Sequence, residues 1–187
     1  MNMKTSTLIA LAVSAGLISA SASSAITGTP SVQATFTTTV EAGTCTAQLQ
    51  NAGGQPISTL AFGDVFKSDL IAQSRSEPFK IAFSGCAGVR SASVEATAGS
   101  GGTCSGDAHT GDSFDASNAT AFEVWKGTAG SGTLMSCNTK PVQNVTISGG
   151  TANFNMAARI VIAQDKAIAD VTTGDVSAPV TFVVTYQ

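Results

Sequence analysis

Only one stretch of the chain groups residue types that could perform acid–base or metal chemistry. Asp107, His109 and Asp112 lie close together, and two carboxylates with an imidazole can bind a metal ion or transfer a proton. The stretch is rich in Gly, Ser, Asp and Thr, so we interpret these side chains as solvated loop residues. His109 is the sole histidine and has no evident serine or cysteine partner for a catalytic triad. We therefore predict no catalytic site, metal or cofactor, and a chain that is not an enzyme.

The four cysteines are the other reactive side chains: Cys45, Cys86, Cys104 and Cys137. An even number in an exported chain most simply forms two disulfides, for which three connectivities exist. Zinc binding is the alternative, but the chain has no C-x-x-C spacing. Chain order favours Cys45 with Cys86 and Cys104 with Cys137. Each bridge is expected to stabilise the fold by roughly 4 kcal/mol in the chain-entropy model.

The tryptophan offers a further binding chemistry. Trp125 lies in the expected strand Ala121–Lys126, AFEVWK, and its ring could stack on a sugar. We favour a partly buried core residue instead. The surrounding residues 99–132 are rich in Gly, Ser, Asp and Thr and predict a long surface loop, which either carries a binding function or is a tolerated insertion.

The first residues predict export. Lys4 precedes the apolar run Leu8–Ile18, and small residues follow at Ala20–Ala22. This is the pattern of a secretory signal peptide covering residues 1–22, with cleavage as late as residue 25. The run is shorter than the roughly 20 residues of a membrane span, and no later stretch is long and apolar enough. We expect no direct membrane insertion, a retained N-terminal anchor being the alternative.

Composition predicts a single all-β domain. The mature chain of roughly 160 residues suffices for one domain with its own core. Gly, Ala, Ser, Thr and Val are abundant and charged residues make up only 11% of the chain, a composition suited to short strands and turns. The net charge of -3 gives no electrostatic basis for binding nucleic acid.

The last residues predict a strand with one buried face. Within residues 174–187, GDVSAPVTFVVTYQ, the even positions are mainly apolar and most odd positions are polar. Both hydrogen-bonding edges of such a strand need cover. No sequence follows Gln187 to supply it, so an earlier segment or another chain is expected to do so. Residues 26–40 alternate in the same way, and form either the first strand of the same domain or a strand donated to a neighbour.

These features together resemble the chaperone-usher pilins of the type 1 and P pilus kind. The family resemblance is carried by Gly174 at the start of the last fourteen residues and by the penultimate Tyr186. It is also carried by an alternating segment before the first cysteine and by the separation of about forty residues between Cys45 and Cys86. The segment 79–86, FKIAFSGC, is similar to the family strand that ends in the second cysteine.

Further strands of this kind are expected at residues 57–65 and 151–161. The chain departs from the family pattern at two places. Thr38 stands where many pilins have glycine, seven residues before the first cysteine. The pair Cys104 and Cys137 is not part of the common framework.

The resemblance implies an incomplete immunoglobulin-like β-sandwich of six strands that lacks the last strand and is completed by donor-strand exchange, a mechanism carried over from the family. It implies a donor-strand extension at residues 23–41 and a pilin domain at residues 42–187. The donor residues are then Val32, Ala34, Phe36, Thr38 and Val40. The groove and the strand facing the chaperone comprise Gly174, Val176, Val180, Phe182, Val184 and Tyr186.

The implied function is a structural fimbrial subunit on the bacterial surface that supports cell adhesion. Its implied partners are neighbouring pilin subunits, a periplasmic chaperone and an outer-membrane usher. Two alternatives remain. The chain could be a polymeric adhesin whose loop 104–137 binds a host receptor, which deletion of residues 105–136 would test. It could also be a self-complemented secreted domain in which residues 26–40 fold back.

Overall fold

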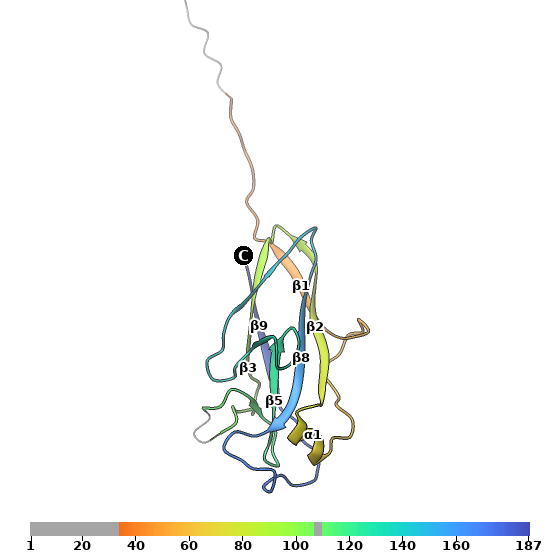
Figure 1. Ribbon diagram of the computed structural model, residues 1–187. Helices are drawn as coiled ribbons and strands as arrows, with labels where there is room; N and C mark the ends of the chain where they lie inside the picture. The colour runs from red at the N-terminus through yellow and green to blue at the C-terminus, as the bar shows by residue number, and fades with distance from the viewer. Residues whose placement is uncertain (1–33, 107–109) are drawn as a thin grey trace, which may run out of the picture. The chain divides into compact units, whose positions relative to one another are not determined.

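The computed structural model describes residues 34–106 and 110–187 (Figure 1). The predicted signal peptide, Val32, Asp107 and His109 lie outside these residues. The chain divides into two units, Met1–Thr39 and Val40–Gln187. The described part of the first unit, residues 34–39, contains no strand or helix, and its side chains are exposed.

Two antiparallel sheets form the second unit. The larger sheet has the strand order β1-β2-β8-β5-β4, with β6 also paired to β5, and the smaller sheet has the order β7-β3-β9. The larger sheet comprises β1 (Thr44–Asn51), β2 (Ser76–Ala87), β8 (Ala152–Ile162), β5 (Thr120–Lys126), β4 (Phe114–Asp115) and β6 (Thr133–Leu134). The smaller sheet comprises β7 (Gln143–Thr146), β3 (Ser91–Ala98) and β9 (Val180–Tyr186).

The core lies between the two sheets. Alternate residues of the long strands point inward, because side chains alternate across a strand. In β2, Phe79, Ile81 and Phe83 are at most 5% exposed, and in β3 the equivalent row includes Val94 at 0%. The all-β prediction is confirmed, as are the strands expected around residues 79–86, 121–126 and 151–161. The described residues form nine strands, of which β4 and β6 have two residues each.

One short helix closes an end of the sandwich. The helix α1 (Lys67–Ala72) lies at the opposite end from the start of β1 (Figure 1). Its buried Leu70 forms a second apolar cluster with Ile160 and Val171. Within the described ranges no helix has both the length and the hydropathy that a membrane span requires.

Both disulfides have the pairing that chain order favoured. One joins Cys45 to Cys86 across β1 and β2, and the other joins Cys104 to Cys137. The second bridge is not in a loose loop, because Cys137 is fully buried. It is surrounded by buried residues on both sides of the bridge: Ser105, Ser113, Phe114, Met135 and Ser136.

The expectation of a long surface loop at residues 99–132 was therefore wrong in part. Besides the expected strand β5, this segment contains β4, and the hydroxyls of Ser105 and Ser113 are hydrogen-bonded inside it. The high content of Gly and Ser reflects tight turns rather than a lack of structure. Deleting residues 105–136 removes β5, so this deletion cannot test a binding loop separately from folding.

The strand expected at residues 57–65 is absent. Pro56 forms an isolated bridge to Gln50, and the Ile57 N–H donates to the Leu49 carbonyl at 3.0 Å, but residues 58–65 belong to no strand. Their alternation has another cause, because Leu60 and Phe62 pack against the core from a non-strand segment. Gly63, at φ 63°, then turns the backbone out of the extended conformation.

The last strand is shorter than residues 174–187. It begins at Val180, because Pro179 has no N–H to contribute to a ladder. The carbonyl of Pro179 instead accepts a hydrogen bond from the N–H of Gly99 at 2.8 Å. Gly174, at φ 140°, and Val176 precede the strand, and Val176 packs in the cluster of Leu70 rather than in the strand's apolar row.

Candidate functional site

The candidate site consists of two strand edges that are largely uncovered. Among the residues that the structure describes, β9 pairs with β3 on one side only. β1 pairs with β2 on one side, and its other edge has a partner only at its end, where Gln50 bridges to Pro56 and the Ile57 N–H donates to the Leu49 carbonyl at 3.0 Å. The two strands border different sheets and contact each other. We call the inward-facing residues of these two strands the open edge. They are Cys45, Ala47 and Leu49 of β1 and Val180, Phe182, Val184 and Tyr186 of β9.

Burial decreases toward the open edge in the larger sheet. Directly opposed residues of an antiparallel pair lie on the same face, so the register permits a comparison of neighbours. Phe83 of β2 is 2% exposed, whereas its β1 partner Ala47 is exposed. Ile81 is 3% exposed, whereas its partner Leu49 is only half-buried. The core is therefore covered at β2 and uncovered at β1.

The smaller sheet shows the same decrease. Val94 of β3 is 0% exposed and Ala96 is 1% exposed, but their β9 partners Val184 and Phe182 are half-buried. All four even-numbered residues of β9 from Val180 are half-buried, while its odd-numbered residues are exposed. Both sheets thus lose cover on the side where β1 and β9 meet.

The open edge is apolar and continuous with the core. The ring of Phe182 lies 5.9 Å from the ring of Phe79, and the ring of Tyr186 lies 6.4 Å from that of Phe83. Neither β1 nor β9 contains Asp, Glu, Lys or Arg. An apolar strip beside unpaired backbone N–H and C=O groups is suited to receiving a further strand.

The structure places the predicted site residues in two groups. Val180, Phe182, Val184 and Tyr186 lie together on β9, whereas Gly174 and Val176 do not belong to this row. Of the predicted donor residues within the described ranges, Ala34, Phe36, Thr38 and Val40 are exposed and outside any strand. The β1 wall was not predicted, although the alternation of Cys45, Ala47 and Leu49 in TCTAQLQN contains the signal.

The other candidate chemistries have structural partners. The carboxylate of Asp112 accepts a hydrogen bond from the Ser136 hydroxyl. Trp125 is partly buried, but it alternates with the core residue Val124 and its ring is covered by the Arg159 guanidinium at 5.4 Å. The same Arg159 forms an ion pair with Glu123 at 2.6 Å. No group of three potential metal ligands occurs in the described part of the chain.

Comparison with known proteins agrees with this architecture. A family model described as fimbrial protein matches residues 34–187. An uncharacterized fimbrial-like protein, YadL, of Escherichia coli strain K12 is 40% identical over 172 residues, covering 85% of this chain and 86% of that protein.

Solved structures give the same fold class. The structure of a chaperone-usher pilus described in relation to rod uncoiling is similar at a TM-score of 0.54 and 20% identity, covering 84% of this chain and 96% of that one. The P pilus rod subunit PapA matches at a TM-score of 0.48 and 21% identity, over 70% of this chain and 93% of that one. At a TM-score of 0.54, the chaperone-usher pilus structure shows that this chain has the fold of pilin subunits. The chain belongs to the fimbrial protein family.

Proposed function

We propose that this protein is a structural subunit of a chaperone-usher fimbria that polymerises by donor-strand exchange. The supporting observation is that burial decreases toward the open edge in both sheets. Phe83 is buried but its partner Ala47 is exposed, and Val94 is buried but its partner Val184 is only half-buried. Apolar area left in water is unfavourable by about 25 cal/mol per Å², so a strand that covers this edge stabilises the domain.

The residues before β1 can provide such a strand to another subunit. Phe36 is 94% exposed and Val40 is 92% exposed, an unusual state for large apolar side chains. Their two-residue spacing matches the alternation of Val180, Phe182, Val184 and Tyr186. A strand donated from residues 23–41 places its apolar side chains between β1 and β9 and its backbone beside β9.

A donor segment at one end and an acceptor edge at the other produce a head-to-tail contact. Such contacts need not close into a ring, so they generate a filament. In this proposal a periplasmic chaperone covers the open edge before assembly and an outer-membrane usher exchanges that cover for the next subunit's extension. The fimbria then stands on the bacterial surface, where it supports adhesion.

The proposal is tested with the mature chain lacking residues 23–41 and a synthetic peptide of that segment. We expect the peptide to raise the Tm of the truncated chain by more than 10 °C, since covering the edge contributes several kcal/mol. The control peptide carries Phe36→Asp and Val40→Asp. An unchanged Tm with the native peptide contradicts the donor role.

A second measurement distinguishes donation of the N-terminal segment to a neighbouring subunit from folding of that segment back onto its own domain. The untruncated mature chain is expected to form concentration-dependent oligomers after the chaperone is removed. A stable monomer at every concentration, with a Tm matching the peptide-bound form, supports the self-complemented domain and contradicts polymerisation.

A further inference from the structure

The start of β1 and the residue that follows β9 share one end of the domain. Thr44, the first residue of β1, is paired with Ala87 of β2. The Arg90 N–H donates to the carbonyl of Gln187, which follows β9, at 3.0 Å. The turn after β7 lies at the same end, because its backbone is hydrogen-bonded to the last turn of β2. We call this end the β1 end and define it by residues 43–44, 87–90, 148–151 and 187.

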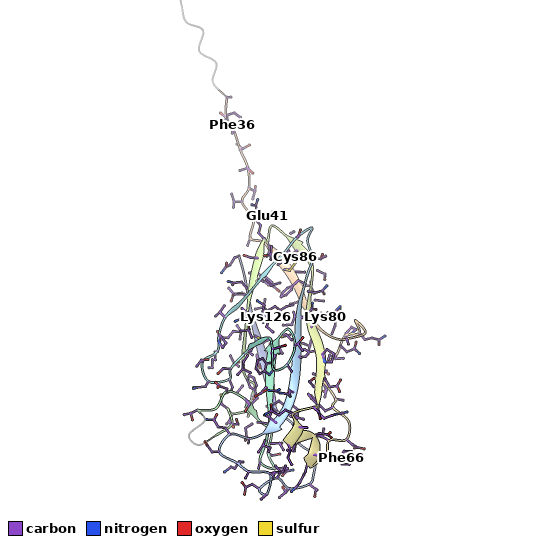
Figure 2. The ribbon with its side chains drawn as sticks, viewed as in Figure 1. Phe36, Glu41, Phe66, Lys80, Cys86 and Lys126 are labelled. Atoms are coloured by element: carbon purple, nitrogen blue, oxygen red, sulfur yellow. A yellow bond between two sulfur atoms is a disulfide. The ribbon has the colours of Figure 1, made fainter. Side chains whose placement is uncertain are left out.

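Helix α1 and the start of β9 share the opposite end. Val176, which precedes β9, packs in the cluster around Leu70 of α1. Figure 2 shows the labelled Phe66 at this end and the labelled Cys86 near the β1 end. We call it the α1 end. A strand that covers the open edge beside β9 therefore runs between the β1 end and the α1 end.

Two large apolar side chains are exposed at the α1 end. Phe66 is 67% exposed and Ile71 is 66% exposed, whereas the neighbouring Leu70 is 5% exposed. Phe66 is the N-cap residue of α1, and its N–H donates to the Asp69 carboxylate at 2.9 Å. Ser, Thr, Asp and Asn are preferred at this position, so the phenylalanine ring adds nothing to the helix. Two such side chains at one end of the domain favour a contact with another molecule.

The direction of the proposed donor strand determines what reaches the α1 end. Antiparallel pairing is the more stable arrangement per residue, and β9 is already antiparallel to β3. A donor strand antiparallel to β9 runs from the level of Tyr186 to the level of Val180. Its last residues therefore leave the open edge at the α1 end of the accepting subunit. The present inference rests in this respect on the proposed function.

The connection between the donor strand and its own domain is short. The apolar donor row ends at Val40, and β1 of the same subunit begins at Thr44. The intervening residues 41–43 allow a span of at most about 14 Å. That span is close to the diameter of one helix. The β1 end of the donating subunit therefore has to lie against the α1 end of the accepting subunit.

The surface of the β1 end permits such a close approach. Apart from Arg90, the exposed residues of its two turns are small: Ala87, Gly88, Ser148, Gly149 and Thr151. Small side chains allow an aromatic ring to lie close to the backbone. Arg90 is exposed, and a guanidinium group packs favourably over an aromatic ring. The β1 end thus suits Phe66 and Ile71 of a neighbouring subunit.

We propose that Phe66 and Ile71 form a second contact between successive subunits, in which the α1 end of one copy packs against the β1 end of the next. Stable interfaces between separate proteins bury at least about 1,000 Å², which two side chains do not supply. The donor strand instead tethers the two copies, and tethering gives effective concentrations in the millimolar range. The contact then fixes the angle between successive domains, which otherwise move about their linker.

Photo-cross-linking in fibres of the mature chain identifies the surface that Phe66 meets. Phe66 is replaced by the photo-reactive p-benzoylphenylalanine, which preserves an aromatic side chain, and mass spectrometry maps the cross-linked peptides. We expect cross-links between subunits to residues of the β1 end. Cross-links only to a second α1 end or to the sheet faces overturn the proposal, as does their absence. The matched control is the same replacement at Val142, a 57% exposed residue before β7, and an equal yield at the β1 end from this position also overturns it.

A double variant, Phe66→Ser with Ile71→Gln, measures what the contact does. Serine is a preferred N-cap residue, so α1 is retained. We expect fibres to form but their persistence length in electron micrographs to fall severalfold, because successive domains move more freely. The control Val142→Gln removes an exposed apolar side chain elsewhere and should leave the persistence length unchanged. An unchanged persistence length in the double variant, or an equal decrease in the control, contradicts the proposed contact.

The peptide experiment distinguishes this inference from donor-strand exchange. The peptide of residues 23–41 should raise the Tm of the truncated double variant as much as that of the truncated native domain, since Phe66 and Ile71 lie outside the open edge. A smaller rise in the double variant means that these side chains support the acceptor domain itself, which contradicts the inference. A native chain without a peptide effect and without polymers contradicts both proposals. A normal peptide effect without the expected cross-link contradicts this one alone.

Discussion

At the scale of single residues, the open edge is defined by differences between opposed neighbours. Val94 and Val184 are the same residue type in one cross-strand pair, yet only Val94 is fully buried. Residue type therefore does not explain the difference, and position at the edge does. The same comparison identifies Ala47 as a residue that faces inward without being covered.

Phe182→Ala should have an effect that depends on the donor strand. In the isolated domain, half-buried Phe182 loses its contact with Phe79 and the variant should unfold about 1–2 kcal/mol more easily. In the peptide-bound domain the ring becomes fully buried, so the loss should increase to about 3–5 kcal/mol. Urea denaturation with and without the peptide measures both values.

The matched control for this prediction is Phe122→Ala. Phe122 packs on Phe62 with ring centroids 5.0 Å apart, in the cluster near α1 and away from β9. Its loss of stability should be the same with and without peptide. Equal losses for Phe182→Ala in the two states are incompatible with a donor strand lying over that ring.

At the scale of elements, the second disulfide fastens the inserted strand β4 to the sandwich. Cys104 bridges to Phe114 of β4 through the backbone, while Cys137 follows β6 and its N–H donates to the Asp112 carbonyl at 2.9 Å. The bridge and the hydrogen bond both connect the segments before and after β5. A segment that composition indicates as loop is thereby packed against the core.

Replacing both Cys104 and Cys137 by Ala should lower stability by about 2–4 kcal/mol, the usual contribution of a disulfide that closes a loop of this size. The closed loop spans a sequence separation of 33 residues. Differential scanning calorimetry measures the loss, and the far-UV spectrum should retain its strand content. Unchanged stability would show that packing around Phe114 and Met135 alone maintains this region.

At the scale of the whole molecule, the domain of residues 40–187 has a buried core whose cover decreases at β1 and β9. On this side the border strand of the smaller sheet is β9 and that of the larger sheet is β1. A β-sandwich with such a border is stable when a further strand joins it, and the same border is prone to aggregation when none does. Assembly and stability are therefore coupled in the proposed function.

Phe36→Asp in the full-length chain should reduce polymer formation without altering the fold of residues 40–187. A carboxylate entering an apolar groove loses its hydration without gaining a partner, which is unfavourable by several kcal/mol. Electron microscopy of assembled material and the length of detergent-resistant oligomers measure the effect. The control is Thr39→Asp, whose side chain points to the opposite face of an extended donor strand. Equal defects in both variants would argue against the predicted donor face.

The sequence by itself determined the all-β class, the main strands and the apolar row from Val180 to Tyr186. These depend on local alternation, which a chain carries in its own residue order. It also indicated the disulfide pairing through chain order and the family resemblance. Residues 57–65 show the limit of this reasoning, because Leu60 and Phe62 alternate as in a strand but pack without a strand partner.

Only the tertiary structure decided which strands lie at the borders of the sheets. Whether β1 or β2 lies at the border of the larger sheet depends on pairings between segments far apart in the chain. Examples are the pairs of Leu49 with Ile81 and of Val94 with Val184. Local residue order does not encode these pairings.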